Sequence, residues 1–176
     1  HGGVMPGRGI EMLIQIVFRN TNVAAIILGN GDNLYVKSLK EKVKELSLEN
    51  RICFHEAVPQ KELWKYVGAV DVGMILAPAI SRNHLYSLPN KLFENIQSET
   101  PVICPAYPAM KKIVEQYGSG LYCDPTEISE LNHCIERLRT NQKLYKRCKE
   151  NAKIAKDFLC WEREKEKVKD AYEGVI

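Results

Sequence analysis

Residues 87–104 read SLPNKLFENIQSETPVIC, a pattern typical of a loop that rises into a helix and continues into a buried strand. Pro89 suits a first helical turn, because its missing N–H needs no acceptor there and its φ is already helical. The loop is therefore expected to end near Leu88. Leu88, Leu92 and Ile96 recur at helical spacing and predict one apolar face, which would pack this helix on the core.

The opposite face of the same predicted helix carries a base and an acid three residues apart, Lys91 and Glu94. Backbone N–H groups at a helix start have no internal acceptor and suit a phosphate. Lys91 would add a full positive charge, and Glu94 could accept hydrogen bonds from sugar hydroxyls. The pair therefore predicts a sugar-nucleotide site. The alternative is a solvent-exposed Lys–Glu pair on an ordinary surface helix.

Length and composition favour a single folded domain. The chain has 176 residues, of which 45% are hydrophobic and 27% charged, with a net charge of +3. These values are ordinary for a globular protein and do not indicate disorder. Basic and acidic residues are mixed, so a nucleic-acid partner is not expected. No apolar run approaches the roughly 18 residues of a membrane span, and the expected location is cytoplasmic.

Neither disulfides nor a metal site is predicted. The cysteines are widely spaced without a C-x-x-C pair, and the histidines are scattered. Cys53, Cys104 and Cys123 fall in expected strands and Cys148 on an apolar helix face, so we interpret them as small buried thiols. His84 lies in a polar segment without a carboxylate at a recognisable spacing, so no catalytic role is assigned to it.

The first nine residues, HGGVMPGRG, predict a glycine-rich turn that leads into a helix near Ile10. Glycines allow a ligand to approach the backbone closely. The spacing departs from the G-x-G-x-x-G dinucleotide fingerprint, because Met12 stands in place of the third glycine. The helical spacing continues through Val17 and Phe18, which are expected to face the core.

Apolar runs and amphipathic segments alternate along the rest of the chain. Strands are expected at residues 23–28, 51–58, 71–76, 101–104 and 120–123, and helices at residues 34–46, 59–67, 109–117 and 128–138, followed by helical sequence with a kink near Cys160. Such alternation predicts an α/β fold, a Rossmann-like doubly wound parallel sheet with helices on both faces.

Ligands of such sheets bind beyond the carboxyl ends of the strands, so several loops are expected to face one cleft. These loops are residues 2–9, 29–32, 56–58 and 79–88. The polar segment 77–88 is the longest, and a long polar loop at this edge is more often functional than filler. Within it, Arg82 is a further candidate for phosphate binding.

The segment SLPNKLFENIQSETPVI resembles the donor-binding motif in the C-terminal domain of GT-B-fold glycosyltransferases, in particular the large retaining family 4. In that family the second Glu of the motif precedes the Pro of a PVI strand by the same spacing that separates Glu94 from Pro101. The resemblance extends from HGGVMPGRGIE to NAKIAKDFLCWE, almost the whole chain. The family pattern places its first Glu where this chain has Tyr86, so the usual contact of that acid with the donor sugar is not expected.

The resemblance implies one half of a GT-B fold that binds a nucleotide diphosphate sugar. Arg8 and Lys91 would contact the diphosphate, Glu94 the ribose hydroxyls and the backbone near Val58 the base. The full donor-binding set is Gly2, Gly3, Arg8, Val58, Tyr86, Ser87, Leu88, Lys91 and Glu94. A helix start and basic side chains would neutralise the departing diphosphate, so no metal and no cofactor beyond the donor is expected.

The resemblance also implies that residues 1–176 are a single nucleotide-sugar-binding domain from a longer two-domain protein. A doubly wound sheet would place a strand before the glycine turn, and the sequence given lacks it, which agrees with a piece cut slightly inside a domain. An N-terminal acceptor domain would supply the acceptor pocket and the family's catalytic His, so this domain has no assigned catalytic residue and should bind donor without turnover. The terminal helix would cross back to that domain.

The implied reaction is transfer of a hexose to a hydroxyl acceptor with retention, in polysaccharide or glycolipid biosynthesis. Peripheral membrane association of the full-length protein is compatible with such acceptors. Two other classes stay open: a sugar-nucleotide epimerase-like enzyme, and a non-catalytic nucleotide-binding module, because Tyr86 replaces an acid and a fold alone does not fix function. The base, the sugar and the acceptor are not specified by the sequence.

Overall fold

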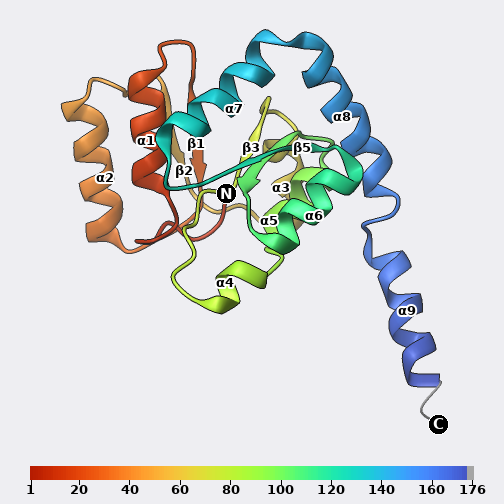
Figure 1. Cartoon of the computed structure of the whole chain (residues 1–176). Helices are drawn as coiled ribbons and strands as arrows, with labels where there is room; N and C mark the ends of the chain where they lie inside the picture. Colours follow the sequence, from red (N-terminus) through yellow and green to blue (C-terminus); the bar gives the residue numbers. More distant parts are fainter. Residues whose placement is uncertain (174–176) are drawn as a thin grey trace.

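Parallel strands in two groups form the centre of the computed structural model, which describes residues 1–173 (Figure 1). The first group consists of β1 (Ala25–Leu28) and β2 (Ile52–His55), and the second of β3 (Gly73–Met74), β4 (Val102–Pro105) and β5 (Gly120–Cys123). Every pairing between these strands is parallel. The structure therefore confirms the predicted α/β fold.

Helices connect the strands and cover both faces of the sheet (Figure 1). They are α1 (Ile10–Arg19), α2 (Asn33–Glu45), α3 (Gln60–Val67), α4 (Arg82–Tyr86), α5 (Asn90–Gln97), α6 (Pro108–Tyr117), α7 (Ile128–Thr140), α8 (Gln142–Lys156) and α9 (Trp161–Glu173). The apolar residues of α1 and α2 share a core cluster with β1 and β2, whereas those of α5 and α6 share one with β4.

Strand β4 shows how both faces are buried. Val102 and Cys104 pack with Leu92 and Ile96 of α5, whereas Ile103 between them packs with residues of α1 and α7. The three strand residues are 0%, 1% and 0% exposed, in that order. Successive side chains of a strand point to opposite faces, so helices on both sides bury every residue of a central parallel strand.

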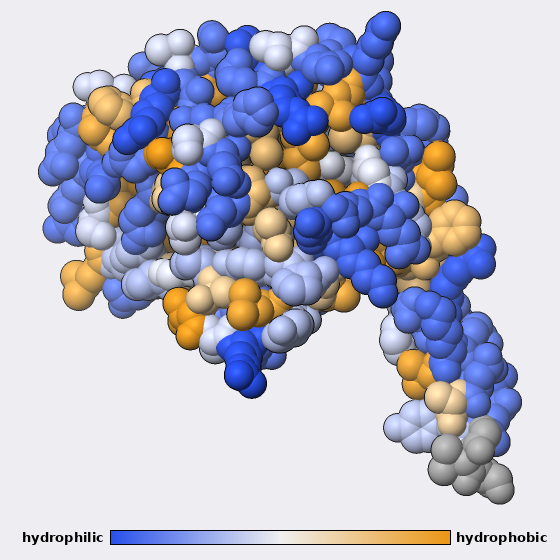
Figure 2. Space-filling model, viewed as in Figure 1, coloured by the Kyte–Doolittle hydropathy of each residue, from blue (hydrophilic) through white to orange (hydrophobic). Residues whose placement is uncertain are grey.

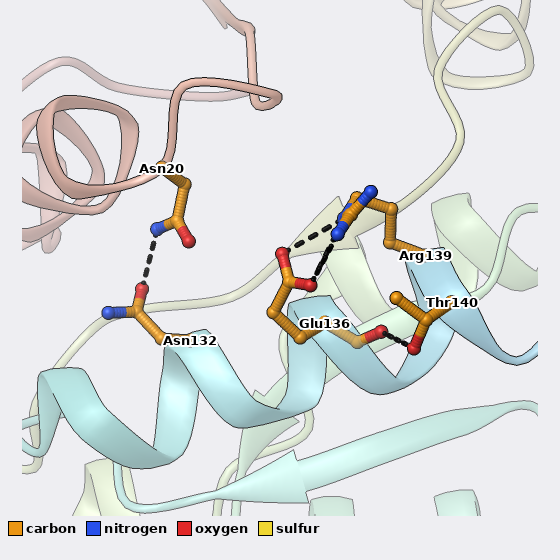
Figure 3. Close-up of polar contacts among 5 residues, drawn as sticks. All are labelled: Asn20, Asn132, Glu136, Arg139 and Thr140. Atoms are coloured by element: carbon orange, nitrogen blue, oxygen red, sulfur yellow. Dashed lines mark hydrogen bonds and ion pairs between the residues drawn. The ribbon is translucent and has the colours of Figure 1, made fainter.

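The C-terminal end of α1 is fixed to α7 by a side-chain amide. Asn20 donates from Nδ2 to Oδ1 of Asn132 at 2.9 Å (Figure 3). Further along α7, the guanidinium of Arg139 donates to the carboxylate of Glu136 at 2.7 Å, and Thr140 Oγ1 donates to the backbone C=O of Glu136 at 2.6 Å (Figure 3). Because the glycine turn lies at the opposite end of α1, the contact with α7 helps to hold that turn in place.

The segment 77–88 is not only the loop that the sequence predicts, because it contains the short helix α4. Ser81 caps this helix, with its hydroxyl accepting from the N–H of His84 at 3.4 Å. Pro89 also differs from prediction, since it is the N-cap residue of α5 rather than part of the first turn. Its ψ of 145° is extended, and α5 begins at Asn90.

Three residues that were predicted to be buried are exposed. Phe18 is 49% exposed because Ile16 takes the inward position on α1, and Leu88 is 40% exposed because it lies before α5 rather than on its apolar face. The third residue is Cys53. The other cysteines that were predicted to be buried, Cys104, Cys123 and Cys148, are buried.

Helix α9 extends away from the rest of the domain (Figure 1), and none of its described residues is buried. Figure 2 shows that hydrophilic residues cover most of this projecting helix. The break between α8 and α9 lies where the kink near Cys160 was predicted. Within residues 1–173, no helix has the length and apolarity that crossing a bilayer requires.

Candidate functional site

The glycine-rich turn packs directly on the ends of strands β1 and β3. The N–H of Gly2 donates to the C=O of Leu28 at 2.8 Å. Gly9 has a φ of 76°, and a Cβ at this position would stand 2.4 Å from the carbonyl oxygen of Leu76. A side chain at Gly9 would therefore meet both backbone strain and a steric overlap. The turn lies at the carboxyl edge of the sheet, where ligands of this fold bind.

Helix α1 begins immediately after this turn with an uncapped N-terminus. Its N-cap residue is Gly9, and no side chain bonds to the first N–H groups. These groups can therefore donate to an anion. The neighbouring Arg8 is exposed and makes no ion pair within residues 1–173.

Lys91 approaches the glycine turn from α5. A Cβ at Gly2 would stand 2.9 Å from Cε of Lys91, so the lysine side chain lies against the bare Cα of this glycine. Both cations, Arg8 and Lys91, line a small cavity of about 60 Å³ together with Gly2 and Gly3. Arg8 and Lys91, which the sequence predicts for the diphosphate, thus lie at one and the same cavity.

The electrostatics around Lys91 favour an anion. Burial lowers the pKa of Lys91, the positive charge of Arg8 lowers it further, and the carboxylate of Glu94 acts in the opposite direction. A partly desolvated ammonium beside a second cation is unfavourable, and a bound anion would relieve both effects. The perturbed pKa of Lys91 therefore agrees with a binding role.

Glu94 contacts two side chains that the sequence analysis did not assign to the site. Its Oε2 lies 2.8 Å from Nε2 of His1, and its Oε1 accepts from Nε2 of Gln60 at 2.9 Å. The side chains of Glu94 and His1 are 22% and 12% exposed. A carboxylate offers about four acceptor positions, so Glu94 retains capacity for a hydroxyl ligand.

Lys91 and Glu94 do not form the exposed surface pair that was the alternative interpretation. Both residues are partly buried, and no ion pair joins them within residues 1–173. The helix face that carries Lys91 and Glu94 is therefore partly buried rather than exposed. The reason is that α5 turns this face toward the glycine turn rather than toward solvent.

The loop around Val58 is held in place independently of the cluster of Arg8, Lys91 and Glu94. Val58 packs against a small core cluster formed by Leu28 of β1 and Leu63 and Val67 of α3. The backbone N–H of Ala57, the residue before Val58, donates to Oδ1 of Asn30 at 2.9 Å. The loops after β1 and β2 are thereby joined, as predicted for a shared cleft.

Tyr86, the last residue of α4, and the residues between α4 and α5 make fewer contacts with the cluster of Arg8, Lys91 and Glu94. Tyr86 is 66% exposed, and Ser87 donates from Oγ to the C=O of His84 at 3.3 Å. Within residues 1–173, Tyr86, Ser87 and Leu88 make no hydrogen bond to Lys91 or Glu94. The side chain of His84 contacts the backbone just before α4, where its Nδ1 lies 3.4 Å from the backbone nitrogen of Ile80.

His1 and Gln60 were not predicted from the sequence as site residues. His1 lies 93 residues before Glu94 and Gln60 lies 34 residues before it, so no local spacing connects them. The one available signal for Gln60 was its place at the start of a helix that follows a strand, at the ligand edge of the sheet. Within residues 1–173, no group of three or more His, Cys, Asp or Glu side chains is arranged to hold a metal ion.

A parallel α/β sheet with a glycine turn, an uncapped helix start and converging cations at its carboxyl edge is an arrangement typical of nucleotide-binding domains. The family model "Glycosyl transferases group 1" matches residues 5–155, and the chain belongs to this family. No curated protein sequence gives a significant match.

Solved structures of glycosyltransferases share the fold. The C-terminal domain of LpcC, a glycosyl transferase group 1 family protein from Francisella tularensis, has 18% identity and a TM-score of 0.71, with 86% of this chain and 79% of that chain covered. Anabaena HepE in complex with UDP has 22% identity and a TM-score of 0.75, covering 88% and 43%. Sucrose-phosphate synthase from Thermosynechococcus elongatus has 19% identity and a TM-score of 0.79, covering 99% and 44%.

The present chain thus spans less than half of the HepE and sucrose-phosphate synthase chains.

Proposed function

We propose that this chain is the donor-binding domain of a glycosyltransferase, which holds a nucleotide diphosphate sugar while the sugar is transferred to a hydroxyl acceptor. The observation that carries the proposal is the convergence of Arg8 and Lys91 on the glycine turn, where Gly2 lets the lysine side chain pack against the backbone. Glu94 lies on the same helix as Lys91, within reach of a sugar attached to the phosphates.

The comparisons support a uridine nucleotide as the first donor to test. HepE, which shares the fold, has been solved with UDP and with UDP-glucose. In our proposal, the helix start of α1, Arg8 and Lys91 neutralise the diphosphate, Glu94 accepts from the ribose hydroxyls and the backbone near Val58 contacts the base. Fixed positive groups stabilise a departing diphosphate because they need no reorganisation as its charge develops.

The proposal extends to the whole protein. Retention of configuration, as in family 4, an N-terminal acceptor domain and a cytoplasmic location remain expectations from the sequence. Peripheral membrane association of the full-length protein is also an expectation from the sequence. We expect donor binding to need no metal ion, so that EDTA leaves the affinity for UDP unchanged. The family match disfavours the epimerase-like alternative and the non-catalytic module.

Calorimetry with UDP and with uridine tests the anion site. Arg8→Ala and Lys91→Ala should each weaken UDP binding by about 1.5 to 3 kcal/mol, because each removes a charge-assisted hydrogen bond, and should leave uridine binding unchanged. Higher salt should reduce the loss, since the charges are partly exposed. Lys112→Ala is the matched control, because Lys112 is an exposed lysine on α6.

Unchanged UDP affinity in both variants, with normal melting temperatures, would contradict the proposed diphosphate site. Equal losses for UDP and uridine would show instead that the substitutions disturb the turn. Conversion of UDP-glucose to another nucleotide sugar by the full-length protein, without an acceptor, would favour the epimerase-like alternative.

A further inference from the structure

Gln60 links helix α3 to the carboxylate of Glu94 on α5. Its side-chain Nε2 donates to Oε1 of Glu94 at 2.9 Å, whereas Oε2 of the same carboxylate lies 2.8 Å from Nε2 of His1. An ionised carboxylate accepts hydrogen bonds and cannot donate, so the NH₂ group of Gln60 must be the half of the amide that faces it. Each oxygen of Glu94 is thus held by a side chain from a different part of the chain.

The two contacts leave acceptor positions on both oxygens of Glu94. An ionised carboxylate offers about four acceptor positions, two on each oxygen. Gln60 occupies one position on Oε1, and His1 occupies one on Oε2. One position therefore remains on each oxygen. Two neighbouring hydroxyls of one ligand, such as the 2′- and 3′-hydroxyls of a ribose, fit this pair of positions.

The loop before α3 fixes the place from which Gln60 reaches Glu94. Gln60 is the first residue of the helix, and Pro59, the N-cap residue, has an extended ψ of 141°. Earlier in the same loop, the N–H of Ala57 donates to Oδ1 of Asn30. The position of the Gln60 backbone is therefore set by the fold and not by its contact with Glu94.

The other end of α3 is joined to the end of α5. Thr100, which follows α5, donates from Oγ1 to the C=O of Val67 at 2.8 Å and is 2% exposed. Leu63 and Val67 are also buried against β1. Breaking a buried hydrogen bond is costly, so the two helices keep their relative position. Gln60 and Glu94 therefore meet on rigid elements, which hold a defined geometry better than loops do.

The contact with Gln60 completes the orientation of the Glu94 carboxylate. One contact fixes one oxygen but leaves the plane of the carboxylate free to turn about it, whereas one contact to each oxygen fixes the plane. Within residues 1–173, Gln60 is the single hydrogen-bond partner of Oε1. A ligand that binds both oxygens thus meets a carboxylate that is already oriented, and its affinity is not reduced by the entropy of ordering that side chain.

We propose that Gln60 is a positioning residue of the donor site, which orients the Glu94 carboxylate toward two neighbouring hydroxyls and so makes the site selective for a ribonucleotide over a nucleotide without these hydroxyls. This inference rests on the proposed function, in which Glu94 accepts from the ribose hydroxyls. The ligand class that it specifies is a nucleoside diphosphate sugar with a vicinal diol on its pentose.

A neutral amide suits this role better than a cation does. The amide of Gln60 holds one oxygen and leaves the negative charge of Glu94 in place, and hydrogen bonds to an ionised acceptor are about twice as strong as neutral ones. A lysine or arginine at position 60 would neutralise the carboxylate and compete with the hydroxyls for it. Gln60 therefore fixes the carboxylate without weakening it as an acceptor.

Calorimetry with UDP and with 2′,3′-dideoxy-UDP tests the proposal. Gln60→Met keeps the length of the side chain and removes its donor. UDP binding should weaken by about three- to tenfold, because one side chain must then be ordered on binding, while the affinity for dideoxy-UDP should change by less than about twofold. Gln142→Met is the matched control and should change neither affinity, because Gln142 is likewise the exposed first residue of a helix, α8.

A double-mutant cycle shows whether Gln60 acts through Glu94. In a chain that carries Glu94→Gln, the further change Gln60→Met should weaken UDP binding by less than about twofold, since no charged carboxylate is left to orient. A purely structural role of Gln60 at the start of α3 would instead give the same loss with and without Glu94→Gln. That result would overturn the proposal.

Unchanged UDP affinity in Gln60→Met, beside a loss in Glu94→Gln that is specific to UDP, would overturn this inference and leave the proposed function intact. Equal losses for UDP and dideoxy-UDP in Gln60→Met would also overturn it. If Glu94→Gln itself caused no loss specific to UDP, the ribose contact of the proposed function would fail, and this inference with it. One set of titrations therefore distinguishes the two failures.

Discussion

The two glycines that flank Arg8 have nearly the same backbone conformation but different surroundings. Gly7 and Gly9 have φ values of 77° and 76°, yet a Cβ at Gly7 meets nothing within 4 Å, whereas one at Gly9 overlaps Leu76. Comparing the two alanine variants separates backbone strain from steric contact. Gly7→Ala should lower the free energy of unfolding by about 1 to 2 kcal/mol, the cost of a left-handed L-residue.

Gly9→Ala should lower the free energy of unfolding further, by about 3 kcal/mol or more, because strain and overpacking add. Urea denaturation followed by circular dichroism measures both variants. Equal losses in the two variants would show that the turn can move away from β3 at no cost, and would contradict the tight placement of the anion site on the sheet.

Glu94 provides a second prediction at the residue level. Glu94→Gln should weaken binding of UDP by about 1 to 3 kcal/mol, because an amide replaces a charged acceptor of the ribose hydroxyls. A 2′,3′-dideoxy nucleotide lacks these hydroxyls, so its affinity should hardly change. Calorimetry with both ligands measures the difference, and the same loss for both would exclude the ribose contact. Gln60→Ala is a useful comparison, because it removes a neighbour of Glu94 and keeps the carboxylate.

Among the elements, α9 contributes least to the stability of the described domain. It has no buried residue, whereas Ala152 and Ala155 of α8 are both 0% exposed. A chain that ends after Cys160 should therefore keep its melting temperature within about 1 °C, since surface changes rarely exceed 0.5 kcal/mol. A chain that ends after Asn141, which lacks α8, should unfold at a much lower temperature. A large loss in the first truncation would show that α9 packs on the domain in solution.

The existence of most elements was predictable because each carries its own local pattern. The apolar runs of β1, β2, β4 and β5 and the amphipathic spacing of α2 and α7 do not depend on distant residues. The short helix α4 was not predicted, because its formation depends on one side-chain cap, Ser81, inside a polar segment. Strand β3 is shorter than its apolar run predicts, with Gly73 and Met74 as its paired residues.

At the scale of the whole molecule, the stability of a chain that begins at His1 should depend on pH through the α-amino group of this residue. Its pKa is about 6 in the fold, lowered by burial and by Lys91, against 8.0 for the ordinary group. Between these two pKa values, the unfolded chain binds more protons than the folded chain does. The destabilisation by protonation is therefore complete below pH 6 and absent above pH 8. Stability should therefore rise by about 1 to 3 kcal/mol from pH 6 to 8.

Urea denaturation at several pH values measures this rise. N-terminal acetylation removes the charge and should abolish it, while the histidine side chains remain as before. An equal pH dependence in the acetylated chain would assign the rise to other groups.

The candidate site was partly predictable for a physical reason. Arg8, Lys91 and Glu94 were identified because the turn and helix that carry them have recognisable local sequences. Their partial burial was not predictable, since it arises where α5 meets the turn about 90 residues earlier in the chain. The bonds of Glu94 to His1 and Gln60 likewise depend on the packing of separate elements, for which the sequence contains no spacing.

Gln97, the last residue of α5, holds the segment that separates α8 from α9. Its Nε2 donates to the C=O groups of Lys156 and Leu159, both at 3.0 Å, and Lys156 also pairs with Glu99. The base of the projecting helix is therefore attached to the same helix that carries Lys91 and Glu94. A force applied to α9 would therefore act on the end of α5.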